Sequence, residues 1–224
     1  NREVVRRIAD AGHEIGNHGY THERFVEKTV EEQREIIGKT QRIIKEITGK
    51  EPEGFRTPSG DWHVRTPYIL SEMGFAYSSS MRGDDKPYYT VLDGEESDLV
   101  EIPSKWELDD YVAQAYSVYP AEPSGLDRIS CYRNVQDNDI REFRGYYDMG
   151  LCIVFLMHPQ ISGAPGRILV LEEVLREITS HEDVWIATGR EIAKYWKQAY
   201  PRKNQQSHKP GSRRNTPDGG GKEA

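Results

Sequence analysis

The chain has 224 residues, enough for one large domain or two small ones, and its hydrophobic content of 36% is low but still supports a core. The net charge of −7 argues against a general nucleic-acid-binding protein, because such proteins need a basic surface. The longest strongly apolar run, residues 151–157, is far too short to span a bilayer, and no signal peptide is visible. We therefore expect a cytoplasmic protein with no nucleic-acid or membrane partner, although an extracellular location stays open because the chain begins with Asn1 rather than Met.

Helical and strand-like segments alternate along the first half of the chain. Thr29 and Glu32 form a capping box at the start of a helix whose apolar residues repeat with helical spacing as far as Ile47, and Gly49 ends it. The other predicted elements of this half are the end of a helix at 2–11, strands at 13–18, 54–57, 75–79 and 99–103, a helix at 66–73, and a polar loop at 81–96.

The second half begins with residues 111–136, whose aromatic residues and two prolines predict a long loop. Residues 151–157 are a continuous apolar run, as expected of a strand buried on both faces. The segment from Pro201 to Ala224 contains no Val, Ile, Leu, Phe, Trp or Met, so it predicts a disordered polar tail behind one domain of residues 1–200. The other predicted elements are a helix from Asp137 or Asn138 to Met149, a helix at 168–178, a strand at 184–187, and a helix that a second capping box opens at Thr188 and that runs to about residue 200.

This alternation of strands and helices predicts an α/β fold with a parallel sheet and crossover helices, either open or closed into a barrel. In such folds the loops at the carboxyl ends of the strands carry the chemistry. His18, Arg56, Trp106 and His158 each lie at or just after the end of a predicted strand. The sequence therefore predicts that these side chains converge on one face of the sheet and form one site.

The first stretch with recognisable chemistry places His18 and His22 four residues apart, with Gly12, Gly16 and Gly19 beside them. Neutral imidazole nitrogen is a common zinc ligand, and the glycines let the backbone turn tightly. Such a pair also arises by chance, so by itself it leaves metal-binding and surface or capping histidines as alternatives.

Two further stretches give the histidine pair a context. Phe55-Arg56-Thr57-Pro58-Ser59-Gly60-Asp61-Trp62 lies between two predicted helices, and Leu156-Met157-His158-Pro159 ends the apolar strand. With these stretches the chain resembles the polysaccharide deacetylase family, the NodB homology domain of carbohydrate esterase family four, over about residues 1–200. The matching motifs, in order and at the approximate spacing, are His18-X-X-X-His22, Arg56-X-Pro58-X-Gly60 and Leu156-X-His158.

The resemblance implies a distorted barrel of strands and helices and a metal-dependent hydrolase that removes N-acetyl groups from peptidoglycan, chitin or a related glycan. His18 and His22 would hold a divalent metal, with zinc as the expected ion, together with an aspartate from a strand that precedes them in the family. No such strand lies upstream of Gly12. We therefore expect a chain that lacks its first strand or two, is poorly stable, binds zinc weakly and does not deacetylate by itself.

The resemblance also implies roles for other residues. His158 would be the general acid that protonates the leaving amine, and Arg56 would hold the carboxylate of the catalytic base. Asp109 or Asp110 resembles a carboxylate that steadies the charged residues of the site, and the sequence leaves open which of the two it is. Candidate substrate contacts are Pro58 and Ser59, and also Trp62 and Trp106, which could equally well fill the core.

Two alternative functions stay open at this level. One is hydrolysis of a small amide by an allantoinase-like or cyclic-imide amidohydrolase, because such proteins resemble the regions of Trp62 and of His158-Pro159. The other is a degenerate domain that binds carbohydrate through its aromatic loops without turnover. The expected ligand is accordingly an N-acetylated glycan or a small amide.

Overall fold

The computed structural model describes residues 1–115 and 130–202. Part of the predicted loop at 111–136 thus lies outside the described residues, as does nearly all of the predicted tail from Pro201. Within the described ranges, every helix is too short or too polar to cross a membrane.

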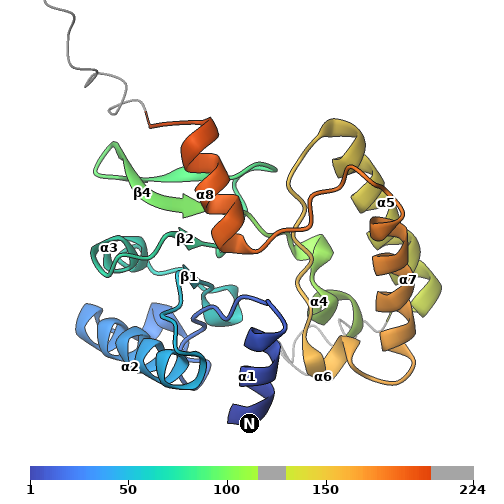
Figure 1. Cartoon of the computed structure of the whole chain (residues 1–224). Coiled ribbons are helices and arrows are strands. Elements are labelled where there is room, and N and C mark those ends of the chain that lie inside the picture. The colour runs from blue at the N-terminus through green and yellow to red at the C-terminus, as the bar shows by residue number, and fades with distance from the viewer. Residues whose placement is uncertain (116–129, 203–224) are drawn as a thin grey trace, which may run out of the picture.

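A four-stranded sheet forms the centre of the N-terminal half (Figure 1). Its order is β1 (Gly54–Phe55), β2 (Tyr77–Ser78), β4 (Glu95–Glu101) and β3 (Tyr88–Leu92). The first three strands are parallel, and β3 runs antiparallel to β4. Because the parallel strands end at one edge of the sheet, the residues that follow them meet there.

Helices cover both faces of this sheet. Leu99 and Val100 are successive residues of β4, so their side chains point to opposite faces. Leu99 belongs to a core beneath α2 (Val30–Thr48) and α3 (Thr66–Glu72), whereas Val100 packs near Ala193 of α8 (Gly189–Ala199). The first core contains Phe25, Ile37, Phe55, Ile69, Leu70, Phe75 and Leu99.

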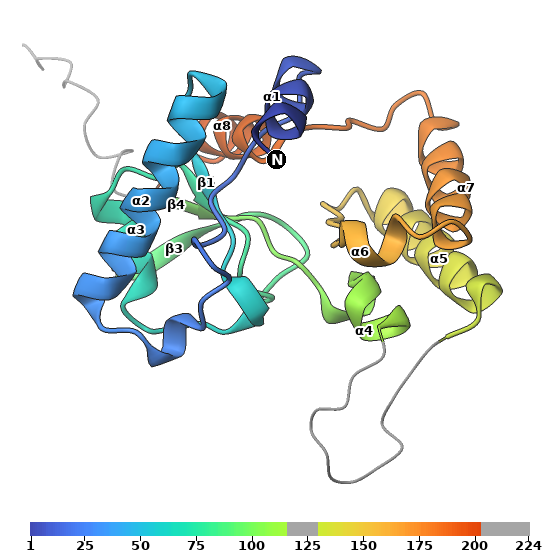
Figure 2. The ribbon, with the colours of Figure 1, turned by 90° about the horizontal axis from the view of Figure 1, so that it is seen from below.

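A second group of helices lies on the side away from α2 and α3 in both views (Figure 1, Figure 2). The long members are α5 (Tyr132–Met149) and α7 (Arg167–Thr179), which pack together around Phe143, Val174 and Ile178. Two short helices, α4 (Asp110–Gln114) and α6 (Pro159–Ser162), lie between them and the sheet. The remaining elements are α1 (Arg2–Asp10) and the 3-10 turns Phe25–Glu27, Pro58–Gly60 and Trp106–Leu108.

The helices with clear caps form where the sequence predicts them. Thr29 caps α2 with the predicted capping box, and Gly49 ends this helix in the left-handed conformation. Thr188 opens α8 in the same way. Both predicted loops are partly wrong. The loop at 111–136 begins within α4 and ends within α5, which starts at Tyr132 instead of near Asp137, and the loop at 81–96 contains β3 and the start of β4.

Three predicted strands, at 13–18, 151–157 and 184–187, are not hydrogen-bonded strands. In the described ranges, the first two contribute only isolated parallel bridges, one between Asn17 and Phe55 and one between Asp109 and Leu156. A strand needs a neighbour that takes up its backbone hydrogen bonds, and an apolar run in the sequence does not reveal whether one is present. Trp185 and Ile186 are accordingly 56% and 65% exposed.

Candidate active site

His18 follows the bridge residue Asn17 at the edge of the sheet. The buried Asn17 side chain donates to Ile37 O at 2.9 Å and accepts from Gly19 N at 3.2 Å, which fixes the turn that carries the histidine. The rings of His18 and His22 meet edge to face, with their centroids 5.2 Å apart. The predicted histidine pair is therefore a pair in space.

The hydrogen bond of His18 fixes its tautomer. His18 Nδ1 lies 2.7 Å from the Arg56 carbonyl oxygen, and since a carbonyl can only accept, Nδ1 must carry the proton. Although one side of the ring is exposed, the protein around it lowers the pKa of His18, mainly by desolvation, with repulsion from His22, Arg56 and His158 adding to it. At neutral pH the Nε2 lone pair is thus available, which is the usual arrangement of a metal-binding histidine.

His22 and Ser59 share an unusual backbone conformation. Their φ angles are 62° and 58°, in the left-handed region that non-glycine residues seldom adopt, and His22 Nδ1 lies 3.4 Å from Ser59 Oγ. Such strain persists only where the surroundings enforce it, and it often marks functional sites. Pro58, the other candidate substrate contact of this motif, is buried.

Arg56 is held by the next strand of the sheet. Its Nε donates to Ser79 O at 2.8 Å and its Nη2 to Ser79 Oγ at 2.5 Å. Burial lowers the pKa of Arg56. No carboxylate of residues 1–115 or 130–202 forms an ion pair with Arg56, so its predicted carboxylate partner stays a prediction.

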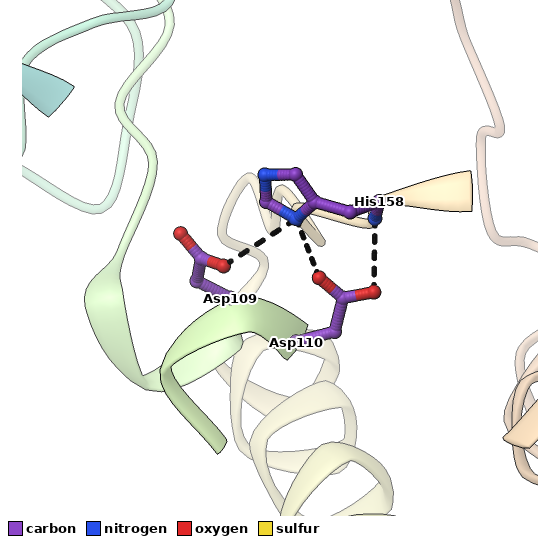
Figure 3. A group of neighbouring side chains, drawn as sticks. All are labelled: Asp109, Asp110 and His158. Atoms are coloured by element: carbon purple, nitrogen blue, oxygen red, sulfur yellow. Dashed lines mark hydrogen bonds and ion pairs between the residues drawn. The ribbon is translucent and has the colours of Figure 1, made fainter. Parts of the chain in front are cut away.

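Asp110 and His158 form the most highly connected pair of the site (Figure 3). His158 Nδ1 donates to Asp110 Oδ1 at 2.6 Å, and the His158 backbone N–H donates to Oδ2 at 2.9 Å. Ser162 donates to the same Oδ2 through its backbone N–H, at 3.2 Å, and through its hydroxyl, at 2.5 Å. One oxygen of this buried carboxylate therefore holds the imidazole, and the other holds the backbone of His158 and Ser162.

Asp109 caps a helix and does not form a hydrogen bond with the imidazole. Its Oδ1 accepts from Tyr111 N at 2.9 Å and so caps α4, and it lies 3.8 Å from His158 Nδ1. The sequence left open which aspartate serves the site, and the geometry indicates Asp110. A parallel bridge aligns residues 108–110 with Leu156 and so places Asp110 beside His158. In this bridge Leu156 N donates to Leu108 O at 2.9 Å, and Asp110 N donates to Leu156 O at 3.1 Å.

One ligand atom each from Asp109, Asp110 and His158 lie within 4.8 Å of one another, so this group could also hold a cation. However, Asp110 accepts four hydrogen bonds, and His158 Nδ1 directs its proton at Asp110. A metal ion on these atoms would have to displace those bonds. The geometry therefore fits a hydrogen-bonded acid–imidazole pair better than a metal centre.

The two candidate tryptophans occupy different environments. Trp62 is partly buried and packs against the core beneath α2 and α3, whereas Trp106 is 45% exposed. The guanidinium of Arg82 lies 3.5 Å from the Trp106 ring centroid, and a Cβ on Gly60 would come within 2.4 Å of the ring edge. Of the two tryptophans, Trp106 therefore offers the accessible aromatic surface for a sugar ring, and Arg82 fixes the orientation of this ring.

The histidine pair and the Asp110–His158 pair lie within electrostatic range of each other. The charge of His158 contributes to the lowered pKa of His18, and that of Asp109 acts on both Arg56 and Arg82. Sequence reasoning missed Ser79, Arg82 and Ser162. For Ser79, the one signal in the sequence was the run of serines at 78–80, at the end of a predicted strand.

A cavity of about 330 Å³ lies on the other side of Asp110, among α4, α5, α6 and α7. Its wall includes Asp139, a buried carboxylate of α5 that accepts a hydrogen bond from the Asn138 side-chain amide at 3.5 Å. Burial raises the pKa of Asp139 to about 6, and the charges of Asp110 and Glu142 contribute to the rise.

We expect Asp139→Asn to stabilise the protein at neutral pH. Between pH 4 and 6 the folded protein binds a proton at Asp139 that the unfolded chain does not, so wild-type stability falls as the pH rises through this window. The variant should therefore gain about 3 kcal/mol above pH 6, and the gain should vanish below about pH 4. Urea unfolding at several pH values measures it. Asp137→Asn, an exposed change on the same helix, is the control, and a gain independent of pH would contradict the assignment.

Comparisons with known proteins show which proteins this chain resembles. A family model described as Polysaccharide deacetylase matches residues 1–78. A peptidoglycan deacetylase of Helicobacter pylori is 32% identical over 225 residues, which cover 90% of this chain and 76% of that protein.

Solved structures show the same fold. A putative polysaccharide deacetylase from Mycobacterium smegmatis superposes with a TM-score of 0.78 at 35% identity, over 88% of this chain and 68% of that one. Puue allantoinase superposes with a TM-score of 0.76 at 24% identity, over 90% of this chain and 64% of that one, a likeness that shows the fold alone. The α/β fold with a parallel sheet, related to a distorted barrel, is thus confirmed.

Proposed function

The chain belongs to the polysaccharide deacetylase family, and we propose that it hydrolyses the acetamide bond of an N-acetylated glycan in a metal-dependent reaction. The observation that carries this proposal is the Asp110–His158 pair, because breaking an amide requires a placed proton donor for the leaving amine. Since the H. pylori relative is named a peptidoglycan deacetylase, the glycan strands of peptidoglycan are the first substrate to test.

His158 is the proposed general acid. With Nδ1 bound to Asp110, the other ring nitrogen, Nε2, is the one that can pass a proton to the amine. Asp110 holds the ring in one orientation because its carboxylate accepts from both the imidazole and the backbone N–H of His158. Such positioning matters, because a misplaced donor loses much of its effect.

The histidine pair is the proposed metal site, with zinc as the proposed ion. The bond from His18 Nδ1 to the Arg56 carbonyl and the lowered pKa of His18 both suit a metal-binding imidazole. No Asp or Glu among the described residues completes a group of three ligands with His18 and His22. A bound divalent ion would supply an activated water and would polarise the amide carbonyl.

Two further residues have proposed roles around this centre. Arg56, fixed by Ser79, would orient a carboxylate that takes a proton from the water. The exposed part of Trp106 would stack on a sugar ring, with Arg82 fixing its orientation.

Acetate release tests the proposal. Saturating zinc should offset the weak binding of two histidine ligands. In contrast to the inactivity expected from the sequence alone, we therefore expect the protein to release acetate and free amines in equal amounts from N-acetylglucosamine oligomers or peptidoglycan, and His158→Ala to release both roughly 10²–10⁴-fold more slowly. Allantoin and a cyclic imide are the comparison substrates. Hydrolysis of these alone would overturn the glycan assignment, and glycan binding with no product would indicate a non-catalytic carbohydrate-binding domain.

A further inference from the structure

Glu101, the last residue of β4, is a buried carboxylate that the proposed mechanism leaves without a role. Only 1% of its surface is exposed. Burial raises the pKa of its carboxyl group, and the hydrogen bonds that it accepts and the charge of Arg56 oppose this rise. Because a buried ionisable group is costly unless its surroundings compensate it, the contacts of Glu101 show what the fold uses it for.

Glu101 holds the chain that leaves β2. The last register pair of β2 and β4 joins Ser78 to Glu101. Just beyond this pair, the backbone N–H groups of Ser80 and Met81 both donate to Glu101 Oε1, at 2.5 Å and 2.8 Å. The side chain of Glu101 thus takes the place of a neighbouring strand for residues 78–82, which we call the serine segment.

The serine segment holds the Arg56 motif on one side. The guanidinium of Arg56 donates to both the carbonyl and the hydroxyl of Ser79. The backbone N–H of Thr57 donates to Ser80 Oγ at 3.1 Å. Because these acceptors all belong to the serine segment, a shift of the segment would shift the guanidinium of Arg56 with it.

The same segment holds Arg82 on its other side. Arg82 Nη1 donates to Ser80 O at 3.1 Å, and its guanidinium lies over the ring of Trp106. Burial lowers the pKa of Arg56 and of Arg82, and the charge of Glu101 is among those that counteract both shifts. Glu101 is therefore connected to both arginines, through the hydrogen bonds of the segment and through its charge.

We propose that Glu101 is a positioning residue of the active site, which fixes the serine segment and, through it, the guanidinium groups of Arg56 and Arg82. Its effect on the reaction rests on the proposed deacetylase function, in which Arg56 orients a carboxylate and Trp106 stacks on a sugar ring. Glu101 acts through the segment and not by contact with the substrate. The acceptor at Oε1 carries the role, because both backbone hydrogen bonds end there.

Two variants separate the hydrogen bonds of Glu101 from its charge. Glu101→Gln removes the charge and keeps an acceptor at the position of Oε1, and the hydroxyl of Ser78, a neighbour of the carboxylate, can accept from the new NH₂ group. Glu101→Asp keeps the charge, but its carboxylate is one methylene too short to reach the two backbone N–H groups. Glu95→Asp makes the same change at an exposed residue of the same strand and serves as the control.

Steady-state acetate release from the N-acetylglucosamine trimer, with added zinc, gives kcat and KM. For Glu101→Asp we expect kcat to fall about tenfold through the displacement of Arg56, and KM to rise about threefold through that of Trp106. Glu101→Gln should stay within about twofold of the wild type in both constants, and Glu95→Asp should match it.

The rates are compared at a temperature at which circular dichroism shows every variant to be folded. A role in stability alone would lower the melting temperature of Glu101→Asp and leave its kcat and KM unchanged, and this result would overturn the proposal. A loss in Glu101→Gln as large as that in Glu101→Asp would also overturn it, since the charge and not the hydrogen bonds would then be what matters.

A measurement on the Arg56 side chain tests the positioning without turnover. The Nε–H group of Arg56 donates to Ser79 O, so its ¹H–¹⁵N resonance reports where the guanidinium lies. The spectrum of Arg56→Lys identifies this resonance by its loss. We expect the resonance to shift or broaden in Glu101→Asp and to stay in place in Glu101→Gln and Glu95→Asp.

The resonance distinguishes this proposal from the proposed function. If the wild type releases no acetate from any glycan, the deacetylase function fails. In that case, an Arg56 resonance that is displaced in Glu101→Asp alone still supports Glu101 as the positioning residue. A resonance that is unchanged in Glu101→Asp, or equally displaced in Glu101→Gln, overturns the proposal whatever the activity.

Discussion

Replacing His158 with alanine should lower kcat for acetate release by roughly 10²–10⁴-fold with little change in KM. As the proposed general acid, the imidazole acts on the reacting bond only through the proton that it gives, so its loss should affect the transition state more than substrate binding. Asp110→Asn should lower kcat through the same ring. The substitution replaces one carboxylate oxygen with an NH₂ group, so the side chain can no longer accept from both His158 Nδ1 and Ser162 Oγ.

Asp109→Asn is the matched control for this prediction. Asp109 is the neighbouring aspartate and lies 3.8 Å from His158 Nδ1, but its hydrogen bond goes to the backbone of α4. Its replacement should change kcat by less than a factor of about ten. An equal loss for both aspartates would show that the two act together and would contradict the assignment to Asp110 alone.

Replacing His18 with alanine should weaken zinc binding by on the order of 100-fold or more, because it removes one of the two proposed ligands and leaves His22 alone. Treatment with a chelator should abolish acetate release by the wild type, and added zinc should restore it. Zinc affinity is measured by competition with a chromophoric chelator.

Two comparisons make this prediction specific. His13→Ala removes an exposed histidine from the same segment and should leave zinc affinity unchanged. Asp110→Asn disrupts the alternative cation group of Asp109, Asp110 and His158 and should also leave it unchanged. If zinc affinity followed Asp110 instead of His18, the metal would have to be assigned to that second group.

The elements with local signals were predictable from the sequence. The caps at Thr29 and Thr188 depend on residues three positions apart, and the helices they open begin where expected. The hairpin of β3 and β4 also had a local signal, because Asp93-Gly94 forms its turn with φ angles of 51° and 85°. The polar residues on either side of this turn favoured the prediction of a loop over that of two strands.

The sequence predicted several residues of the site but not most of the contacts that hold them. The motifs selected His18, Arg56 and His158. Their hydrogen-bond partners lie 38 residues away for His18, 23 for Arg56 and 48 for His158. Sequence spacing alone could not decide between Asp109 and Asp110, because one residue of register in the bridge to Leu156 determines which carboxylate faces the ring. Likewise, no pattern in the sequence indicated that Ser79 would hold Arg56.

The separation of Asp110 and His158 along the chain has a consequence for folding. Their hydrogen bond closes a loop across 48 positions, and the entropy of that closure must be compensated before the pair can form. The backbone hydrogen bonds within helices such as α5 and α7 are local, and local contacts form faster than contacts between distant residues. During refolding we therefore expect helix content, followed by circular dichroism, to return before the acid–imidazole pair and the activity that depends on it.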